Sequence, residues 1–435
     1  MKIYMTRILA IILVALLLVG CTPMDWFGLN DRTLNGVALD DYTIVYSDAA
    51  PDYCKRAARY IYEQVLARTG LKLAVRKDNE GTYGHEILVG DTNRELSQKV
   101  KAQSRNMEFY FTADDNHIAM NADYFIIAAA AYYFIETYIP GDSFKSTIAK
   151  NEVIARKPIT EEANNIIFLI GDGMGFNHTK LLEDYDIGEM ISEGINLLFE
   201  RSDNEDIFYG YYLPYQGSLR TNSLSGTTDS AAAATALACG YKTVNRYLGL
   251  DWKGNEIQSL TELAGSLGMS TAVLSTEDHT GATPGGFSSH VLDRSYGAEI
   301  FEDQTKLSAE IGTLIKCGLN ENLQFEEVIT DVLHNLEDNE NGFFLMYEEA
   351  YIDKNSHSNL LMSAMMCVAR FNQAIGVFME HAFYHPDTLV IITADHETGG
   401  LTRREDGFYK FTSTDHSSAD VPIFAYGYGA EVFAD

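Results

Sequence analysis

The 435-residue sequence is poor in proline, in cysteine and in positive charge. With only 8 prolines and 46% hydrophobic residues it can bury a large core, so a collagen-like or disordered chain is excluded. Its five cysteines include no CxxC pair, which leaves a zinc ribbon or a thioredoxin-like site without support. Lys and Arg total 32 against 62 Asp and Glu, a formal net charge of -30. Such a surface repels nucleic acid, and an anionic substrate would need a local positive site.

The first twenty residues have the pattern of an export signal. Two basic residues precede the apolar run 8–19, which is too short to span a bilayer and has the length of a signal-peptide core. The run ends in the letters LVGC, which resemble a bacterial lipobox; an ordinary secretory signal is the alternative. We therefore predict a signal peptide over residues 1–20 and a lipid anchor at Cys21. The protein would be exported to the cell envelope, periplasmic or on the cell surface, anchored to the membrane without spanning it.

A small α/β domain is predicted over residues 35–150, after a tether at 21–34. Apolar runs of strand length alternate there with two helical stretches: strands at 43–46, 71–75, 86–89 and 117–120, helices at 53–68 and 122–139. No motif in this accessory domain is specific, so we expect it to be a packing or binding scaffold. Residues 151–164, with mixed charges and a proline, are predicted to be a linker.

The region 165–435 predicts a doubly wound α/β domain. Its β-rich apolar runs lie at 165–170, 271–274, 343–346 and 388–392. Helical stretches separate them, which is typical of a mostly parallel sheet with helices on both faces.

Potential metal ligands follow each of these four runs. Ligands bind beyond the carboxyl ends of the strands in such sheets. The residues found there are Asp172, the segment 276–283, Glu348 with Asp353, and Asp395 with His396. A turn or a helix cap explains any one of them, but their coincidence at one edge of the sheet favours a metal site.

The spacing of these residues supports the same site. Asp353 and His357 are four residues apart, so a helix presents both on one face. His416 lies in a loop rich in Ser and Thr. Ser230 follows Asp229 at the start of an alanine-rich helical run, where a serine is most often an N-cap. If metals faced it, the cations and the helix N-terminus would stabilise an alkoxide.

Five segments resemble the alkaline phosphatases in content and order, over about residues 165–426. They are IGDGMG at 170–175, TDSAA at 228–232, ATP at 282–284, Glu348 with IDK at 352–354 and His357, and TADHETGG at 393–400. The resemblance implies a phosphomonoesterase with two Zn²⁺ and one Mg²⁺ and with Ser230 as nucleophile.

The family pattern also assigns each ligand. It implies one zinc at Asp353, His357 and His416, a second zinc at Asp172, Asp395 and His396, and magnesium at Asp172, Thr283 and Glu348. It implies that Arg294 binds the phosphate. We expect broad specificity for phosphate monoesters and an alkaline optimum, and the resemblance leaves a homodimer open.

The sequence departs from the family pattern in three places. Gly281 stands where members carry an Asp or His two residues before the threonine. Asp278 or His279 could reach back to replace that side chain, and a turn or helix-cap role is the alternative for both. Only 54 positions separate Arg294 from Glu348, and no glycine-rich strand is evident between them. Nineteen residues follow His416, without the usual closing helix. We therefore expect a shortened catalytic domain that lacks a strand after Arg294.

Other functions stay open at this point. A sulfatase would need a Pro two residues after the nucleophile and an Arg four residues after it, whereas alanines follow Ser230. A phosphodiesterase of the same superfamily would usually have a threonine nucleophile. A degenerate phosphatase domain acting as a surface binding protein is the third alternative.

Overall fold

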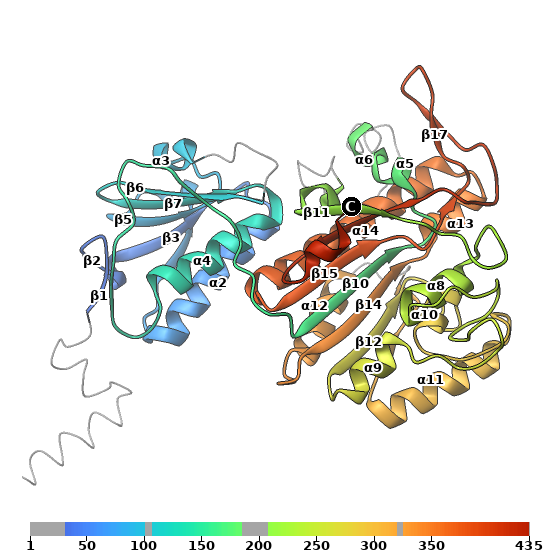
Figure 1. Cartoon of the computed structure of the whole chain (residues 1–435). Helices are drawn as coiled ribbons and strands as arrows, with labels where there is room; N and C mark the ends of the chain where they lie inside the picture. Colours follow the sequence, from blue (N-terminus) through green and yellow to red (C-terminus); the bar gives the residue numbers. More distant parts are fainter. Residues whose placement is uncertain (1–30, 101–106, 185–207, 320–324, 435) are drawn as a thin grey trace, which may run out of the picture. The chain divides into compact units, whose positions relative to one another are not determined.

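The computed structural model describes residues 31–100, 107–184, 208–319 and 325–434. They form two compact units, divided between Ile159 and Thr160, and each is described by itself (Figure 1). The predicted signal peptide and the predicted anchor at Cys21 lie outside the described residues.

The first unit is a six-stranded mixed sheet with helices α2 (Asp52–Thr69) and α4 (Ile127–Tyr138), which pack against each other. The strand order is β4 (Ala74–Lys77), β3 (Tyr42–Tyr46), β5 (His85–Val89), β7 (His117–Ala122), β6 (Phe109–Ala113) and β9 (Ile154–Arg156). A short helix α3 (Glu95–Lys99) and a small sheet of β2 (Val37–Ala38), β1 (Arg32–Leu34) and β8 (Phe144–Ser146) complete the unit. The predicted small α/β unit is therefore present.

The element boundaries of this unit differ from the sequence prediction at its edges. Strand β4 begins at Ala74 instead of Leu71, and β9 lies inside the predicted linker. Both are edge strands whose side chains are exposed or half-buried, so no run of buried apolar residues marks their bounds in the sequence. The end of α2 agrees with prediction: Gly70 takes a left-handed conformation at φ +73°, and its N–H donates to the Leu66 carbonyl.

The second unit is built on a seven-stranded sheet. Its order is β11 (Tyr215–Leu219), β20 (Val421–Tyr426), β15 (Thr388–Thr393), β10 (Asn165–Gly171), β14 (Phe343–Glu349), β12 (Ser270–Ser275) and β13 (Leu314–Lys316). The five strands from β15 to β13 are parallel, and β20 runs antiparallel to both its neighbours. The four strands predicted from apolar runs, β15, β10, β14 and β12, are adjacent members of this parallel part, which confirms the predicted fold class.

The expected loss of a strand after Arg294 is wrong as stated. The three-residue strand β13 lies in that interval and pairs with β12 at the edge of the sheet. Its side chains are exposed or half-buried, so no buried apolar run marks it in the sequence.

Helices cover both faces of the sheet (Figure 1). On one face lie α12 (Phe325–Leu336) and α14 (Leu361–Tyr384), where Phe371 and Phe378 of α14 pack on the buried Tyr347 of β14. On the other lie α8 (Ser230–Cys239), α9 (Leu260–Ser266) and α10 (Ala282–Gly286), with α11 (Gly297–Ile311) against α9. Helix α14 is long and apolar enough to cross a membrane, but it is a core helix here, with more than half of its apolar window buried.

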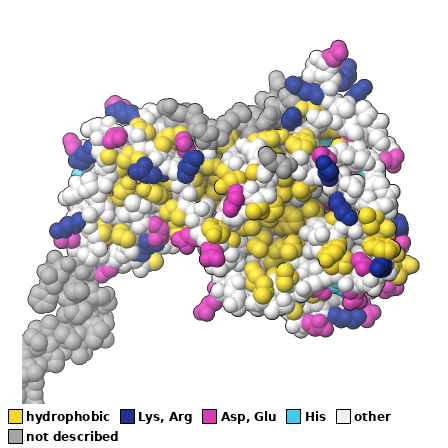
Figure 2. Space-filling model, in the orientation of Figure 1, with side chains coloured by type: hydrophobic (Ala, Val, Ile, Leu, Met, Phe, Trp, Pro, Cys, Tyr) yellow, Lys and Arg dark blue, Asp and Glu magenta, His cyan; other side chains and the backbone are white. Residues whose placement is uncertain are grey.

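The face that carries α8 to α10 is only partly covered in the part of the chain that the structure describes. Ile166, Ile315 and Leu389 on this face remain partly exposed beside the buried core. Figure 2 shows apolar side chains gathered over the sheet here.

The remaining elements of the second unit are short and lie around the ends of the strands. They are α5 (Phe176–Thr179), α6 (Leu181–Asp184), η5 (Tyr209–Tyr212), α13 (Tyr351–His357), the pairs β16 (Glu397–Thr398) with β19 (His416–Ser417) and β17 (Thr402–Arg403) with β18 (Tyr409–Lys410), and η7 (Ala430–Phe433).

Candidate active site

The structure gathers the predicted ligands at the carboxyl end of the parallel sheet. Asp172 directly follows β10, Glu348 is the next-to-last residue of β14, and Asp395 follows β15 by two positions. These strands are neighbours in the sheet, so their ends converge although they are far apart in the sequence. Gly173 permits the close approach, because at φ +75° a Cβ there would lie 2.9 Å from the Asp353 backbone and from the Thr398 hydroxyl.

One group of ligands consists of Asp172, Asp395 and His396. The Nε2 atom of His396 lies 3.5 Å from Asp172 Oδ1 and 3.2 Å from Asp395 Oδ2. All three residues are buried, and neither carboxylate oxygen has a hydrogen-bond partner among the described residues. Buried acceptors left in this way are costly unless a cation occupies the space between them. These atoms therefore fit a metal ion.

A second group consists of Asp353, His357 and His416. Asp353 Oδ1 lies 3.4 Å from His357 Nε2 and 3.6 Å from His416 Nε2, and it accepts a hydrogen bond from the Thr398 hydroxyl at 2.5 Å. The first two residues come from α13, where their four-residue spacing puts both on one face, as predicted. His416 comes from β19, which pairs with β16 just after His396.

Backbone carbonyls fix which tautomer the neutral rings of the two histidines in this second group adopt. His416 Nδ1 lies 2.9 Å from the Thr228 carbonyl, and His357 Nδ1 contacts the Thr414 carbonyl. A carbonyl only accepts, so each Nδ1 carries a proton and each neutral ring presents a lone pair at Nε2. The two Nε2 atoms face each other at 3.1 Å. Such facing lone pairs are the arrangement that a shared metal ion stabilises.

Burial, together with neighbouring negative charges, raises the pKa of the buried carboxyl groups. Burial, and then the charges of Asp395 and Asp353, raise the pKa of Asp172 well above its ordinary value. Burial and the charge of Asp353 raise that of Asp395 to about 6 against the backbone N–H groups that lower it. Burial lowers the pKa of His396 to about 3, with His416 adding to the effect. The site thus collects negative charge that only added positive charge can hold at neutral pH.

Ser230 is the first residue of α8 and faces the first metal-ligand group. Its Oγ lies 3.2 Å from His396 Nε2, and its side chain is buried. The cap of this helix is Asp229, whose Oδ1 accepts from the Ala232 backbone N–H at 3.0 Å. The cap is therefore the preceding aspartate, and the Ser230 hydroxyl is left at the positive end of the helix dipole.

Arg294 lies beside the same helix start. Its Nη1 is 3.5 Å from Asp229 Oδ2, and its side chain is about one-third exposed. The neighbouring Asp293 holds Arg246 through two hydrogen bonds of 2.7 Å, and the Arg246 backbone N–H donates to Asp229. Asp229 thus links the serine helix to the arginine loop.

The predicted magnesium ligands Thr283 and Glu348 are both fully buried. Glu348 Oε2 accepts from the Ser275 hydroxyl at 2.5 Å, whereas Glu348 Oε1 and Thr283 Oγ1 have no hydrogen-bond partner among the described residues. Burial and then the charge of Glu277 raise the pKa of Glu348 well above its ordinary value. Together with Asp172, these oxygens form a set that suits a hard cation such as Mg²⁺.

Glu277 fills the space next to Gly281. A Cβ added at Gly281 would collide with the Glu277 carboxylate. Lys354 holds that carboxylate, with Nζ 2.7 Å from Oε2. The charge of Glu277 also acts on Asp172 and Glu348. Glu277, four residues upstream, therefore occupies the space that a side chain at position 281 would take.

Asp278 and His279, the two candidates for reaching back to this position, make other contacts. Asp278 accepts from the Thr280 backbone and hydroxyl at 2.9 Å, and the His279 ring packs edge-on against Phe301 at 5.1 Å between ring centroids. The strand-end rule could have found Glu277, because it is a carboxylate two residues after β12.

Comparison with known proteins agrees with this geometry. The family model described as "Alkaline phosphatase" matches residues 163–323 and 320–412, more than half of the chain. The chain is 26% identical to Alkaline phosphatase 3 of Bacillus subtilis over 59% of its own length and 66% of that protein. It is 28% identical to Alkaline phosphatase 4 of the same organism over 58% and 65%. The chain thus spans slightly less than two thirds of these curated relatives.

Solved structures give the same family. The alkaline phosphatase of the Antarctic bacterium TAB5 is 26% identical, with a TM-score of 0.52 over 63% of this chain and 94% of that one. A mutant of that enzyme with Mg bound in its M3 site aligns with a TM-score of 0.50 and 25% identity, over 64% and 94%. From its matched residues and its fold, the chain belongs to the alkaline phosphatase family, whose members are metal-dependent hydrolases.

Proposed function

We propose that the chain hydrolyses phosphate monoesters through a phosphoserine at Ser230. The observation that carries the proposal is the Ser230 hydroxyl at a helix N-terminus, 3.2 Å from His396 within a group of metal-type ligands. In the first step Oγ forms a bond to phosphorus while the ester oxygen leaves as the alcohol. In the second step water displaces the serine oxygen, which releases inorganic phosphate and regenerates Ser230.

Two Zn²⁺ and one Mg²⁺ are the proposed cofactors. Imidazole with carboxylate suits zinc at Asp172, Asp395 and His396, whose ligand atoms lie within 4.8 Å of one another. The same ligand types occur at Asp353, His357 and His416. Asp172, Thr283 and Glu348 would hold magnesium. When bound, these ions would supply positive charge for the attacking and leaving oxygens.

The protein's own groups orient the phosphate. Arg294 would donate two hydrogen bonds to the phosphoryl oxygens, and its position next to Asp229 brings it beside the nucleophile. The N-terminus of α8 adds the partial positive charge of its free N–H groups. Since the assigned groups all contact the phosphoryl group, we expect broad specificity for the alcohol, and activity that rises toward alkaline pH as the hydroxyl nucleophiles ionise.

Glu277 completes the third metal site in this proposal. The Lys354 ion pair keeps it beside the ligands Asp172 and Glu348, which it influences through its charge. A carboxylate there would orient the water ligands of magnesium.

A covalent-trapping experiment tests the reaction. Protein supplied with zinc and magnesium is given a ³²P-labelled aryl phosphate and quenched in acid. The unaltered chain should retain label on Ser230, and Ser230→Ala should lose both the label and most of the turnover. Ser266→Ala, an exposed serine on α9, is the control and should behave like the unaltered chain. Full turnover in Ser230→Ala would refute the covalent mechanism, and faster hydrolysis of a diester would favour the phosphodiesterase alternative.

We also propose that the protein is exported and lipid-anchored through Cys21, where it would meet phosphate monoesters outside the cytoplasm. Metabolic labelling with a radioactive fatty acid tests the anchor: Cys21→Ser should abolish the label. Retained label in that variant would contradict the proposal.

A further inference from the structure

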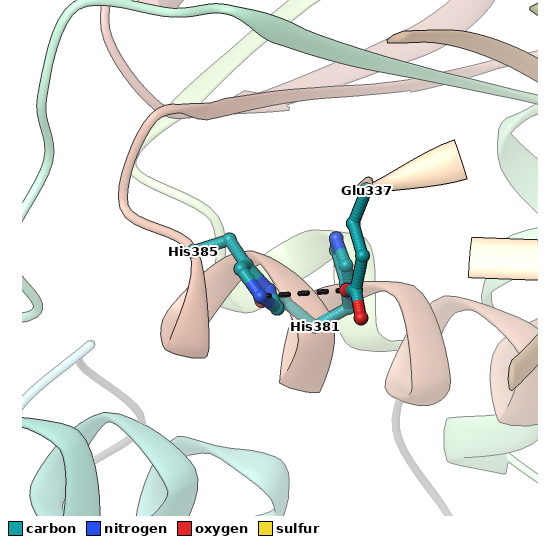
Figure 3. Close-up of side chains that lie close together, drawn as sticks. All are labelled: Glu337, His381 and His385. Carbon is teal, nitrogen blue, oxygen red and sulfur yellow. Dashed lines mark hydrogen bonds and ion pairs between the residues drawn. The ribbon is translucent and has the colours of Figure 1, made fainter. Parts of the chain in front are cut away.

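A further group of metal-type side chains, outside the active site, lies at the opposite end of the catalytic sheet. Glu337 directly follows α12, His381 lies in the last turn of α14, and His385 follows that helix (Figure 3). Strands β14 and β15 begin near these residues at Phe343 and Thr388, whereas the active-site ligands follow the other ends of the same strands. This group, called the distal cluster below, is therefore separate from the active site.

The three side chains converge on one point. His385 Nε2 lies 3.4 Å from Glu337 Oε2, and His381 Nδ1 lies 3.8 Å from the same oxygen. One ligand atom from each of the three residues lies within 4.8 Å of the others. The two imidazole rings stack with centroids 4.1 Å apart, close to the 3.6 Å between His396 and His416 in the active site. In Figure 3 both rings reach toward the carboxylate.

Hydrogen bonds leave the nitrogen of His385 available as a ligand. Its Nδ1 lies 3.1 Å from the His381 carbonyl, which only accepts, so Nδ1 carries the proton and the neutral ring has its lone pair at Nε2. This is the backbone contact that commonly orients a metal-binding histidine. The Nε2 lone pair then faces the Glu337 oxygen.

His381 is buried with few polar neighbours among the described residues. Its side chain is 9% exposed, and its Nε2 has no hydrogen-bond partner among the described residues. Burial and then the neighbouring His385 and His334 lower its pKa well below the ordinary value, so the ring is neutral at pH 7. The ring's Nδ1 faces Glu337 Oε2, so this is the nitrogen that can bind an ion held by the carboxylate.

His334 occupies the other oxygen of the same carboxylate. Its Nδ1 lies 2.7 Å from Glu337 Oε1, which leaves Oε2 for the two remaining histidines. The exposed fractions of Glu337 and His385, 26% and 39%, leave the cluster open to solvent, so an ion could reach it.

We propose that Glu337, His381 and His385 bind a divalent transition-metal ion, preferentially zinc, which joins the end of α12 to the end of α14. Two imidazoles at i and i+4 with one carboxylate are a ligand set typical of zinc, and a water molecule would complete the tetrahedron. Since the cluster is far from Ser230 along these strands, the ion would contribute stability and not chemistry. The proposal does not depend on the proposed reaction.

Metal content and thermal stability test the distal cluster. The unaltered full chain should bind about one equivalent of zinc more than His385→Gln, with the affinity for that last equivalent lowered by more than about tenfold in the variant. Added zinc should raise the melting temperature of the unaltered chain above that of His385→Gln. Aryl phosphatase activity should be equal in both.

Two further variants keep the test decisive. Glu337→Gln keeps the size of the side chain and should lose the same equivalent, even if His385→Gln folds poorly. His117→Gln is the control, because His117 also contacts carboxylates, Asp114 and Glu86. Among the described residues it belongs to no group of three metal-type ligands, so this variant should keep the full zinc content. Equal zinc content and equal zinc-dependent stabilisation in the unaltered chain and both cluster variants would overturn the proposal and leave a proton-mediated His385–Glu337 ion pair in its place.

Discussion

Replacing Glu277 with Gln should weaken the third metal site selectively. The substitution keeps the shape of the side chain but removes the charge that acts on Asp172 and Glu348. It also breaks the ion pair with Lys354, whose Nζ lies 2.7 Å from the carboxylate. The zinc groups contain no atom of Glu277, so their ligands remain complete.

The size of the effect follows from the position of Glu277. It is 13% exposed, so solvent screens its charge only in part. Residues that orient metal ligands contribute about 10–100-fold in metal affinity, which corresponds to about 1.4–2.7 kcal/mol. We expect the dissociation constant for magnesium to rise by that factor while both zinc sites stay filled.

Magnesium titration after mild chelation provides the assay. Binding is measured by calorimetry, and the metal content of the dialysed protein is measured in parallel. Asp278→Asn is the matched control, because it removes the same charge at the next position in the sequence. The Asp278 side chain is 70% exposed and accepts a hydrogen bond from the Thr280 hydroxyl. His279→Ala should also leave magnesium binding unchanged, because that ring packs on Phe301.

Two results would refute this reasoning. An unchanged magnesium affinity in Glu277→Gln would mean that the carboxylate only fills the space beside Gly281. A loss of equal size in Asp278→Asn would mean that the effect is general electrostatics and not the position of Glu277.

Three other predictions concern single side chains. Arg294→Ala should weaken inhibition by inorganic phosphate about 10–100-fold, because it removes charge-assisted hydrogen bonds worth roughly 1.5–3 kcal/mol; unchanged inhibition would reject its phosphate-binding role. Burial opposes the charged form of His290, but its contacts with Glu262 Oε1 at 2.9 Å and the Gly249 carbonyl at 2.8 Å raise its pKa to about 9 from 6.5. Between these pKa values the folded protein holds a proton that the unfolded chain releases, so this contribution to stability is complete below about pH 6.5 and is lost as the pH rises through about 9. The melting temperature of the unaltered chain should therefore fall over this pH range more steeply than that of His290→Gln. An equal pH dependence in both proteins would contradict the assignment. Arg370→Met should lower the free energy of unfolding by about 3–5 kcal/mol in denaturant titrations, because it leaves the fully buried Glu349 without the guanidinium that bonds both its oxygens; a loss under about 1 kcal/mol would show that Glu349 finds another partner.

The central sheet and its ligands could be predicted because they depend on local patterns. A strand buried on both faces is a continuous apolar run, as at Phe343–Met346, and the residue that follows it lies at the ligand-binding edge. Asp172, Glu348 and Asp395 were found in this way.

The parts that could not be predicted depend on how loops fold back in space. The strand-end rule marks Glu277 as a candidate, but its place beside Gly281 depends on the path of the loop after β12, which no periodicity encodes. In the distal cluster the sequence shows the four-residue spacing of His381 and His385, but no pattern connects these histidines with Glu337, at the end of another helix. Strand β13 is too short and too exposed to leave an apolar pattern.

The position of β10 at the centre of the catalytic sheet has a consequence for biosynthesis. This strand is the first of the parallel strands to be made, yet both of its neighbours, β14 and β15, come much later in the chain. Pairings of such high sequence separation form slowly, and they require nearly the whole domain to have emerged. Asp172 therefore cannot contact His396, or take its place beside Asp395, until both of those residues have been synthesised. In the proposed metal sites, loading would then be one of the last steps of maturation, and it would take place in the compartment in which the chain completes its folding.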